Sequence, residues 1–325
     1  MKQESAGVVV ISNPLSGKNK RGGFESFSKK ISQYDAIDHL ITSNESEIFQ
    51  ALMKCKQRRI SIIIVNGGDG TLQCVLSFLK QDSNLDYEPE LLLLQAGTTS
   101  MAYGDVGCKT SLHATLEALA RYVNGGNNPF KKSVRAVIKM TLPATQQSLC
   151  GLFFGAGAIY SGILYCRQQL HTKGVRGELG ASLAMLRFIV DWLTVKRLAT
   201  AVQANIMLDN KHHDQGRYNV ITATSLARLL AGVYPFWAPV KCADAYALTL
   251  IKYNPPRPIM NFLTILRGRA PHTKIQQQHY QSYSVRSAQL DIHGGFTLDG
   301  ELFGDTDKNT RVHLETAGLI TFLSL

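Results

Sequence analysis

Short apolar runs alternate with segments of helical periodicity through the first part of the chain. Runs of apolar and β-branched residues predict strands at 7–12, 38–42, 60–66 and 91–95, and apolar positions three or four residues apart predict helices at 24–34, 46–56, 72–80 and 112–123. Strands this uniformly apolar are typical of a parallel sheet that is covered on both faces. The pattern therefore predicts an N-terminal α/β domain.

The alternation ends at residues 124–129, where the sequence Asn-Gly-Gly-Asn-Asn-Pro indicates a turn. After it the pattern is mostly that of strands, with one helical insertion at about 177–196; the predicted strands are 134–142, 148–154, 199–208, 218–224, 247–253 and 282–291. A chain of 325 residues also exceeds the size at which a single core usually keeps growing. We therefore predict an α/β domain over 1–130 and a β-rich domain over 131–325, with the last strand or helix able to return to the first domain.

The charge balance is strongly positive, with 35 Lys and Arg against 24 Asp and Glu and a formal net charge of +11. This excess favours an anionic partner such as a nucleotide phosphate, an acidic lipid surface or a nucleic acid. Nucleic acid is the weakest of these, because the chain has no recognised binding module and no interleaved aromatic and basic residues. No apolar run is long enough to span a membrane and the first residues do not resemble a signal peptide, so we expect a cytosolic protein.

The strongest chemical signal is Gly67-Gly68-Asp69-Gly70-Thr71, which stands between a predicted buried strand and a predicted helix. Glycines let the backbone come close to a phosphate, and the start of the helix offers free N–H groups and the positive end of its dipole. A carboxylate within such a loop is best explained as holding Mg²⁺, directly or through water, against the phosphate oxygens. Taken alone, the motif fits an ordinary strand-to-helix turn equally well.

Two further loops follow predicted apolar strands in the same way. One is the segment 13–18, Asn-Pro-Leu-Ser-Gly-Lys, and the other is 96–100, Ala-Gly-Thr-Thr-Ser. Because ligands of doubly wound sheets gather at the carboxyl ends of the strands, we expect the three loops to converge. The first loop is not a Walker A motif, since Ser12 and Asn19 stand where that motif requires Gly and Ser or Thr, and no dinucleotide-binding glycine motif follows the first strand.

A pair of carboxylates stands near the end of the chain, in Asp299-Gly300-Glu301, between apolar residues. Asp-Gly in this setting is the commonest signature of a hairpin turn, and local considerations favour that interpretation. The alternative is chemical: the two carboxylates take up a hydroxyl proton and position a metal or an acceptor.

Taken together, Asn13-Pro14-x-Ser16-Gly17, then 67–71, then Gly97-Thr98-Thr99 and finally 299–301 resemble the catalytic region of diacylglycerol kinases and their relatives. These relatives are the soluble bacterial lipid kinases, the sphingosine kinases and the ceramide kinases. The similarity spans nearly the whole chain. It implies a Rossmann-like nucleotide domain, similar to that of phosphofructokinases and NAD kinases, and a C-terminal β-sandwich-like lipid domain.

The resemblance also implies roles for individual residues. Asp299 would be the general base with Glu301 in support, and Asp69 would be a metal ligand. Asp244 falls where many bacterial relatives bind a structural magnesium, although Ala245 replaces their glycine. The residues expected to hold ATP and its Mg²⁺ are Asn13, Ser16, Gly17, Lys18, Thr42, Gly67, Gly68, Asp69, Gly70, Thr71, Gly97, Thr98 and Thr99.

The implied reaction is transfer of the γ-phosphate of ATP to the hydroxyl of a lipid such as diacylglycerol. The segment 155–161 lacks the acidic residue with which sphingosine kinases hold their acceptor, which makes a sphingoid base less favoured. A soluble acceptor, as in NAD kinases, and a catalytically silent lipid-binding relative stay open, as does a homodimer. A lipid acceptor requires contact with a membrane, and residues 258–274, which mix apolar residues with Arg267 and Arg269, are expected either to lie on an anionic membrane surface or to form a core-facing helix with a basic end.

Overall fold

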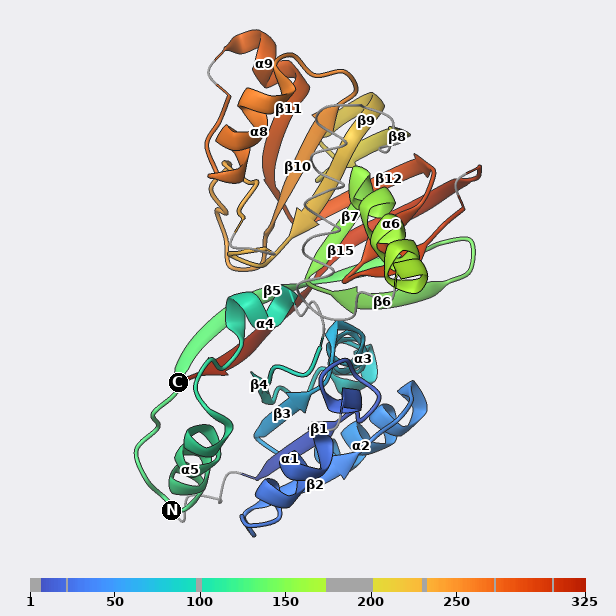
Figure 1. The fold of residues 1–325 in the computed structure, drawn as a ribbon. Helices are drawn as coiled ribbons and strands as arrows, with labels where there is room; N and C mark the ends of the chain where they lie inside the picture. The colour runs from blue at the N-terminus through green and yellow to red at the C-terminus, as the bar shows by residue number, and fades with distance from the viewer. Residues whose placement is uncertain are drawn as a thin grey trace. The chain divides into compact units, whose positions relative to one another are not determined.

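The computed structural model describes residues 7–21, 23–97, 101–173, 201–229, 233–271, 273–305 and 307–325. The chain divides into two compact units, the first comprising Met1–Arg135 and Gly318–Leu325 and the second Ala136–Ala317 (Figure 1). The predicted fold class, an α/β part followed by a β-rich part, is confirmed. The predicted helix at 177–196 lies outside the described residues.

The first unit is built on a parallel sheet with the strand order β4-β3-β1-β2. Every residue of β1 and β3 is buried, as expected for parallel strands covered on both faces. The strands are β1 (Val8–Ser12), β2 (Ile37–Ile41), β3 (Ile62–Asn66) and β4 (Glu90–Leu93), and the helices are α1 (Phe24–Ile31), α2 (Glu45–Gln57), α3 (Asp69–Leu79), α4 (Met101–Val106) and α5 (Leu112–Val123). Two short 3₁₀ turns cover Asn19–Arg21 and Asp82–Asn84.

The C-terminal residues complete this sheet. The last strand, β15 (Asn309–Ser324), ends beside β4 with Phe322 opposite Leu91 and Leu323 opposite Leu92 in parallel register. Phe322 and Leu323 are both buried, so the end of the chain belongs to the core of the first unit.

The second unit consists mainly of antiparallel strands in the order β14-β13-β7-β9-β8-β12-β15, with β10 beside β9 and β11 beside β10. Side chains from nearly all of these strands form one apolar core. The strands that begin in or belong to this part are β5 (Lys131–Leu142), β6 (Gln147–Gly151), β7 (Phe153–Gly157), β8 (Val202–Leu208), β9 (His212–Thr224), β10 (Tyr246–Lys252), β11 (Tyr280–Val285), β12 (Ser287–His293), β13 (Phe296–Leu298) and β14 (Glu301–Phe303). The described helices are α6 (Ala158–Lys173), α8 (Pro258–Leu266) and α9 (Lys274–His279), and no helix in the described part of the chain is long and apolar enough to cross a membrane.

Three predicted strands of this unit differ most from the structure in their limits. The predicted strand 148–154 is divided at Leu152 into β6 and β7, and the predicted strand 282–291 is divided at Arg286 into β11 and β12. The predicted strand 218–224 begins six residues earlier, because His212 to Tyr218 pair with β8. Pattern alone missed these limits, since they depend on partners elsewhere in the chain.

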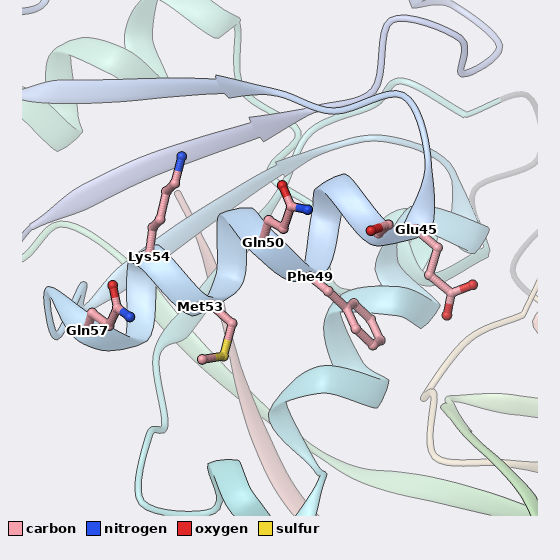
Figure 2. Close-up of a pocket in the computed structure, with 7 residues that line it drawn as sticks. Glu45, Phe49, Gln50, Met53, Lys54 and Gln57 are labelled. Atoms are coloured by element: carbon pink, nitrogen blue, oxygen red, sulfur yellow. The ribbon is translucent and has the colours of Figure 1, made fainter.

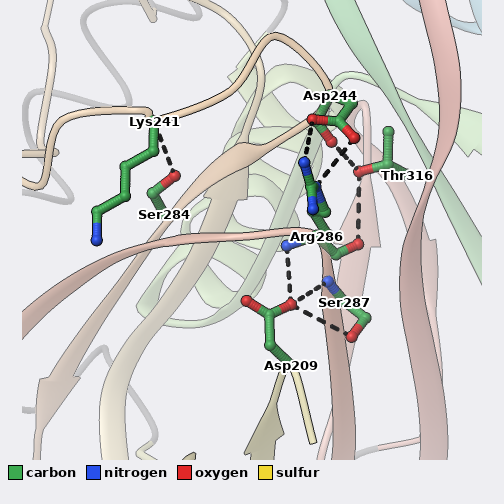
Figure 3. A network of polar contacts seen from close by, with 7 residues as sticks. All are labelled: Asp209, Lys241, Asp244, Ser284, Arg286, Ser287 and Thr316. Atoms are coloured by element: carbon green, nitrogen blue, oxygen red, sulfur yellow. Dashed lines mark hydrogen bonds and ion pairs between the residues drawn. The ribbon is translucent and has the colours of Figure 1, made fainter. Parts of the chain in front are cut away.

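One such partner is Asp209, which follows β8 and holds the junction of β11 and β12 (Figure 3). Its Oδ1 accepts hydrogen bonds from the backbone N–H of Arg286 at 2.9 Å and of Ser287 at 2.8 Å. Asp209 itself has a φ of 49°, in the left-handed region that Asp tolerates better than most residues. The carboxylate thus ties the turn after β8 to the place where one predicted strand becomes two.

Replacing Asp209 by Ala should destabilise the protein by about 1–3 kcal/mol, because two backbone donors lose their acceptor. The measurement is urea unfolding followed by circular dichroism. Asp291→Ala is the matched control, since the Asp291 carboxylate is 44% exposed and pairs only across the surface with Arg311, and its loss should cost under about 1 kcal/mol. Equal losses from the two substitutions would contradict the role given to Asp209.

Candidate functional site

The parallel strand order brings the loops that follow β1, β2, β3 and β4 to one edge of the sheet. Backbone hydrogen bonds join these loops directly: Thr42 N donates to Ser12 O at 2.8 Å, Asn13 N to Asn66 O at 3.0 Å, and Lys18 N to Ala96 O at 2.8 Å. The segments after all four strands are therefore in contact. The predicted convergence of the loops after β1, β3 and β4 is observed for their described residues.

Within the loop after β1, the backbone carbonyl of Asn13 is the central acceptor. It receives hydrogen bonds from the hydroxyl of Ser16 and from the side-chain amide of Asn19, both at 2.8 Å. The amide of Asn19 also donates to Asn66 O at 3.3 Å, at the end of β3. Asn19 is buried, so it acts as a brace between two loops. Sequence reasoning missed this role, although the unusual amide at the position where a P-loop carries Ser or Thr was a signal.

A polar cluster supports the same edge from within the sheet. The hydroxyl of Ser12 is hydrogen-bonded to His39 Nε2 at 2.8 Å and to the side-chain amide of Asn66 at 3.1 Å. Burial lowers the pKa of His39. The three residues come from β1, β2 and β3, so their hydrogen bonds hold these neighbouring strands together near the ends from which the loops extend.

Gly67 and Gly68 are glycines for different reasons. A Cβ on Gly67 would lie 2.4 Å from the Cβ of Thr71, which is buried, so packing excludes a side chain there. Gly68 has φ −86° and ψ −174°, which any residue adopts, and among the described residues a Cβ on it would meet nothing nearer than the Cα of Gly97 at 3.8 Å. No described residue therefore requires glycine at 68. A glycine at a helix start is suited to a ligand that approaches the backbone closely, as a phosphate does.

Asp69 begins α3 and points its carboxylate toward the start of α4. The Met101 N–H donates to its Oδ2 at 3.4 Å. Burial raises the pKa of Asp69 from 3.8 to about 7, against the lowering effect of the N–H groups of Met101 and Ala102. A cavity of about 10 Å³, lined in part by Gly68, Asp69 and Tyr103, lies at this point, and that is about the space that one water molecule needs.

These features fit a magnesium ion held with a nucleotide. Mg²⁺ in phosphate-transfer sites is commonly bound through one or two carboxylates, several waters and the substrate phosphates. Asp69 supplies one carboxylate whose ionised form lacks adequate solvation, so a cation beside it would stabilise that form. The open face of Gly68 supplies the space for a phosphate.

The remaining residues predicted for the nucleotide lie around this edge. Ser16, Gly17 and Lys18 are in the loop after β1, and Thr42 follows β2 with its hydroxyl donating to Ser12 O at 3.3 Å. Gly70 and Thr71 are in the first turn of α3, and the side-chain amide of Asn13 donates to Thr71 Oγ1 at 3.5 Å. Thr98 and Thr99 lie outside the described residues.

In the second unit, Asp299 and Gly300 form the two-residue turn between β13 and β14. Their φ angles are 47° and 90°, as a tight hairpin turn with two left-handed residues requires. The Asp299 carboxylate points back at the break between β6 and β7, where it accepts hydrogen bonds from Leu152 N at 3.1 Å and Phe153 N at 2.9 Å. The predicted hairpin turn is confirmed, and the carboxylate is fixed in one orientation.

Glu301, the other predicted carboxylate, is the first residue of β14 and is exposed. Arg167 of α6 contacts this turn twice: its Nη2 donates to Gly300 O at 2.8 Å and lies 3.7 Å from Glu301 Oε2. Sequence reasoning missed Arg167, because 132 or more residues separate it from the turn and no local pattern marks it. Arg167 holds the turn that carries Asp299.

Asp244 has a partner of opposite charge within the chain (Figure 3). Arg286 Nη2 donates to Asp244 Oδ1 at 3.1 Å, and Arg286 Nε lies 2.9 Å from Asp244 Oδ2. The guanidinium therefore binds the carboxylate in a bidentate manner. The hydroxyl of Thr316 donates to Asp244 O at 2.7 Å. No group of three His, Cys, Asp or Glu side chains suited to a metal occurs among the described residues. The Asp244 carboxylate is paired with Arg286 in this arrangement, and a second cation at Asp244 stays a prediction.

A surface depression lies elsewhere, along α2 (Figure 2). It has a volume of about 700 Å³ and is lined only by residues of that helix, which are Glu45, Ser46, Phe49, Gln50, Met53, Lys54 and Gln57. It brings together no loops and no pair of carboxylates, and Figure 2 shows these side chains spread along the helix rather than directed at one point. We therefore place the candidate site at the carboxyl edge of the sheet.

Comparison with known proteins bears on the family of the chain. Residues 7–130 match the family model of the diacylglycerol kinase catalytic domain, so the family resemblance inferred from the motifs is confirmed. No curated protein matches the chain significantly.

Solved structures share the fold over the whole length. A provisionally assigned diacylglycerol kinase from Bacillus anthracis str. Sterne has a TM-score of 0.65 at 16% identity, covering 99% of this chain and 98% of its own. A second structure with the same provisional assignment and organism has a TM-score of 0.62 at 16% identity, covering 100% of this chain and 99% of its own. A structure of a diacylglycerol kinase of that organism has a TM-score of 0.61 at 14% identity, covering 99% of this chain and 97% of its own. At such identities the likeness shows the fold alone.

The two glycines give a first test of the site. Gly68→Ala should leave stability within about 1 kcal/mol of the original and weaken MgATP binding at least about tenfold, because the new methyl group fills space that no described residue occupies and that the proposed phosphate would use. Gly67→Ala, its matched control, should destabilise the fold by about 1–3 kcal/mol through the clash with Thr71. Urea unfolding and titration calorimetry measure the two effects. Normal ATP binding by Gly68→Ala would exclude the proposed cradle.

The raised pKa of Asp69 predicts a stability that depends on pH. The folded state favours the protonated carboxyl, so the contribution of Asp69 is most favourable below about pH 4 and declines as pH rises to about 7. Asp69→Asn should therefore stabilise the metal-free protein more at pH 8 than at pH 5, by about 1–4 kcal/mol. Thermal and urea unfolding in EDTA across this range provide the measurement. A stability difference that does not change between pH 5 and pH 8 would contradict the burial of this charge.

Proposed function

We propose that this chain, whose residues 7–130 match a diacylglycerol kinase catalytic domain, is an ATP-dependent lipid kinase. It transfers the γ-phosphate of ATP to a hydroxyl group of a lipid such as diacylglycerol. The observation that carries the proposal is Gly68, a glycine that neither its backbone angles nor the described residues around it require, beside a buried carboxylate at a helix start. The proposal assigns residues 1–130 to the ATP-binding domain and residues 131–325 to the lipid-substrate domain.

The loops at the carboxyl edge of the first sheet hold the nucleotide. The backbone of 67–71 and the start of α3 face the phosphates, and the Asn13–Lys18 loop and Thr42 complete the enclosure. Asp69 holds the magnesium, directly or through water. When bound, Mg²⁺ neutralises charge on the phosphate oxygens. The chain's own contribution is to fix the phosphates in line for transfer, which supplies most of the rate in reactions with a loose transition state.

Asp299 is the proposed general base. The acceptor hydroxyl oxygen forms a bond to the γ-phosphorus, the bond from that phosphorus to the bridging oxygen of ADP breaks, and the hydroxyl proton passes to the Asp299 carboxylate. The N–H groups of Leu152 and Phe153 hold the Asp299 carboxylate in one direction. Glu301 and Arg167 support the turn that carries it.

A lipid acceptor has support from the family match and from the chain's charge of +11, which suits an anionic membrane surface. The protein is accordingly proposed to be cytosolic and to associate peripherally with such a surface. A soluble acceptor and a silent lipid-binding relative are the outcomes that would replace this proposal.

The deciding experiment follows labelled γ-phosphate from MgATP into vesicles that contain diacylglycerol, phosphatidylglycerol, ceramide or sphingosine. The wild-type protein should label one lipid. Asp69→Ala should lose ATP binding and activity together. Asp299→Asn should keep ATP binding and lower kcat by about 10²–10⁴, because the amide keeps an acceptor oxygen for the Leu152–Phe153 break and cannot take the proton.

Two controls make the result specific. Unfolding measurements on Asp299→Asn separate loss of the base from loss of the turn, and Glu301→Gln should lower kcat less than Asp299→Asn does. Label in a soluble acceptor without vesicles would indicate an NAD-kinase-like enzyme. ATP binding with no label in any acceptor would indicate a silent relative.

A further inference from the structure

Helix α8 has one face in the core of the second unit and one face in solvent. On the inner side, Ile265 is 2% exposed and packs with Ile251 of β10 and Tyr280 of β11, and the side-chain amide of Asn261 donates to Pro256 O at 2.8 Å. The Tyr280 hydroxyl donates to the same carbonyl at 3.1 Å. These contacts fix the rotation of α8 about its axis, and therefore which residues it exposes.

The outer side of α8 carries large apolar side chains. Ile259, Met260 and Leu263 are 54%, 50% and 51% exposed, and their spacing of one and four residues places them on one face of the helix. They are three of the eleven large hydrophobic side chains that are exposed in the described part of the chain, and no other helix there contributes more than one. Single exposed apolar residues are ordinary, whereas a cluster on a fixed face indicates contact with a partner.

Arginines border this face. Arg257 precedes α8, and Arg267 and Arg269 follow it; all three are exposed, and none forms an ion pair with an acidic side chain within the described residues. Residues 245–290 contain no Asp or Glu at all, and their basic residues are Lys252, Arg257, Arg267, Arg269, Lys274 and Arg286. Lys252 and Arg286 are paired with Asp214 and Asp244 from outside this segment. The exposed side chains of α8 and its flanking residues are apolar at the centre and positive at the ends.

We propose that α8 is the element with which this protein docks on an anionic lipid bilayer. Ile259, Met260 and Leu263 insert at the level of the headgroups, and Arg257, Arg267 and Arg269 contact the lipid phosphates. A helix of nine residues is about 13 Å long, so it lies in the interface and does not cross it. The inference rests on the proposed function in one respect: a lipid acceptor is the reason why this protein would need to reach a bilayer. The docking itself does not depend on catalysis.

Charge distinguishes the bilayer from other occupants of this face. A second copy of the chain would bring the same acid-free segment and the same net charge of +11 against it, so the two faces would repel each other. An anionic bilayer offers both the apolar layer and the phosphates that the α8 surface matches. The interior-facing alternative for this segment accounts for Asn261 and Ile265 and leaves the three exposed apolar residues without a role.

The test measures sedimentation with vesicles in the absence of ATP. Wild-type protein should bind phosphatidylcholine vesicles that contain phosphatidylglycerol, and bind them less at high salt. The double substitutions Met260→Ser/Leu263→Ser and Arg267→Gln/Arg269→Gln should each lower the partition coefficient about tenfold or more. All four side chains are exposed, so thermal unfolding of these variants should match that of the wild type.

Matched controls come from the first unit. Met53→Ser/Leu85→Ser removes two equally exposed apolar side chains, and Lys29→Gln/Lys30→Gln removes two exposed cations. Both control variants should bind vesicles as the wild type does. Equal losses from the control and α8 variants would show a general surface effect and would overturn the proposal.

Failure of the docking inference and failure of the proposed function give different results. If vesicle binding depends on α8 but no lipid is phosphorylated, the docking proposal is supported and the proposed lipid-kinase function is rejected. Phosphorylation of a vesicle lipid that is unaffected by the α8 substitutions supports the kinase and overturns the docking. Vesicle binding unchanged in the α8 variants, together with a loss of self-association in the ultracentrifuge, would assign the face to a second copy and also overturn it.

Discussion

The candidate site depends on one backbone contact, the hydrogen bond from Asn13 N to Asn66 O. It continues the parallel register in which Ser12 of β1 lies opposite Asn66 of β3, and it sets the loop after β1 against the start of the glycine loop after β3. A slip of one residue would turn every side chain of β1 to the opposite face of the sheet. Ser12 would then lose both His39 and Asn66, and Asn19 would no longer reach the end of β3.

The first unit could be predicted well because its signals are local. Most of the parallel strands are apolar runs, and the glycine loop marks where a strand ends and a helix starts. The sequence could not show how the two glycines differ, since Gly67 is required by the Thr71 side chain and Gly68 by none of the described residues. Nor could it show Asn19 as a brace, because its partner Asn66 lies 47 residues away.

The second unit was harder to predict because its strand breaks are set from a distance. Neither Leu152 nor Arg286 is a residue that interrupts a strand by itself. One strand breaks at Leu152, whose N–H donates to the carboxylate of Asp299, 147 residues later. The other strand breaks at Arg286, whose N–H donates to the carboxylate of Asp209, 77 residues earlier. A carboxylate that accepts backbone N–H groups takes them out of the strand ladder. Such breaks are a property of the assembled fold and not of the local pattern.

Asp299 shows that a turn residue and a chemical group need not be alternatives. The turn requires two residues with positive φ, and Gly or Asn at 299 would satisfy it as well as Asp does. Of these residues only Asp carries a carboxylate. The backbone N–H groups of Leu152 and Phe153 donate hydrogen bonds to this carboxylate and fix its orientation. A charge held in this way costs desolvation that an Asn would avoid. The geometry of the hairpin therefore does not by itself select Asp, whereas the proposed role of general base does require a carboxylate at 299.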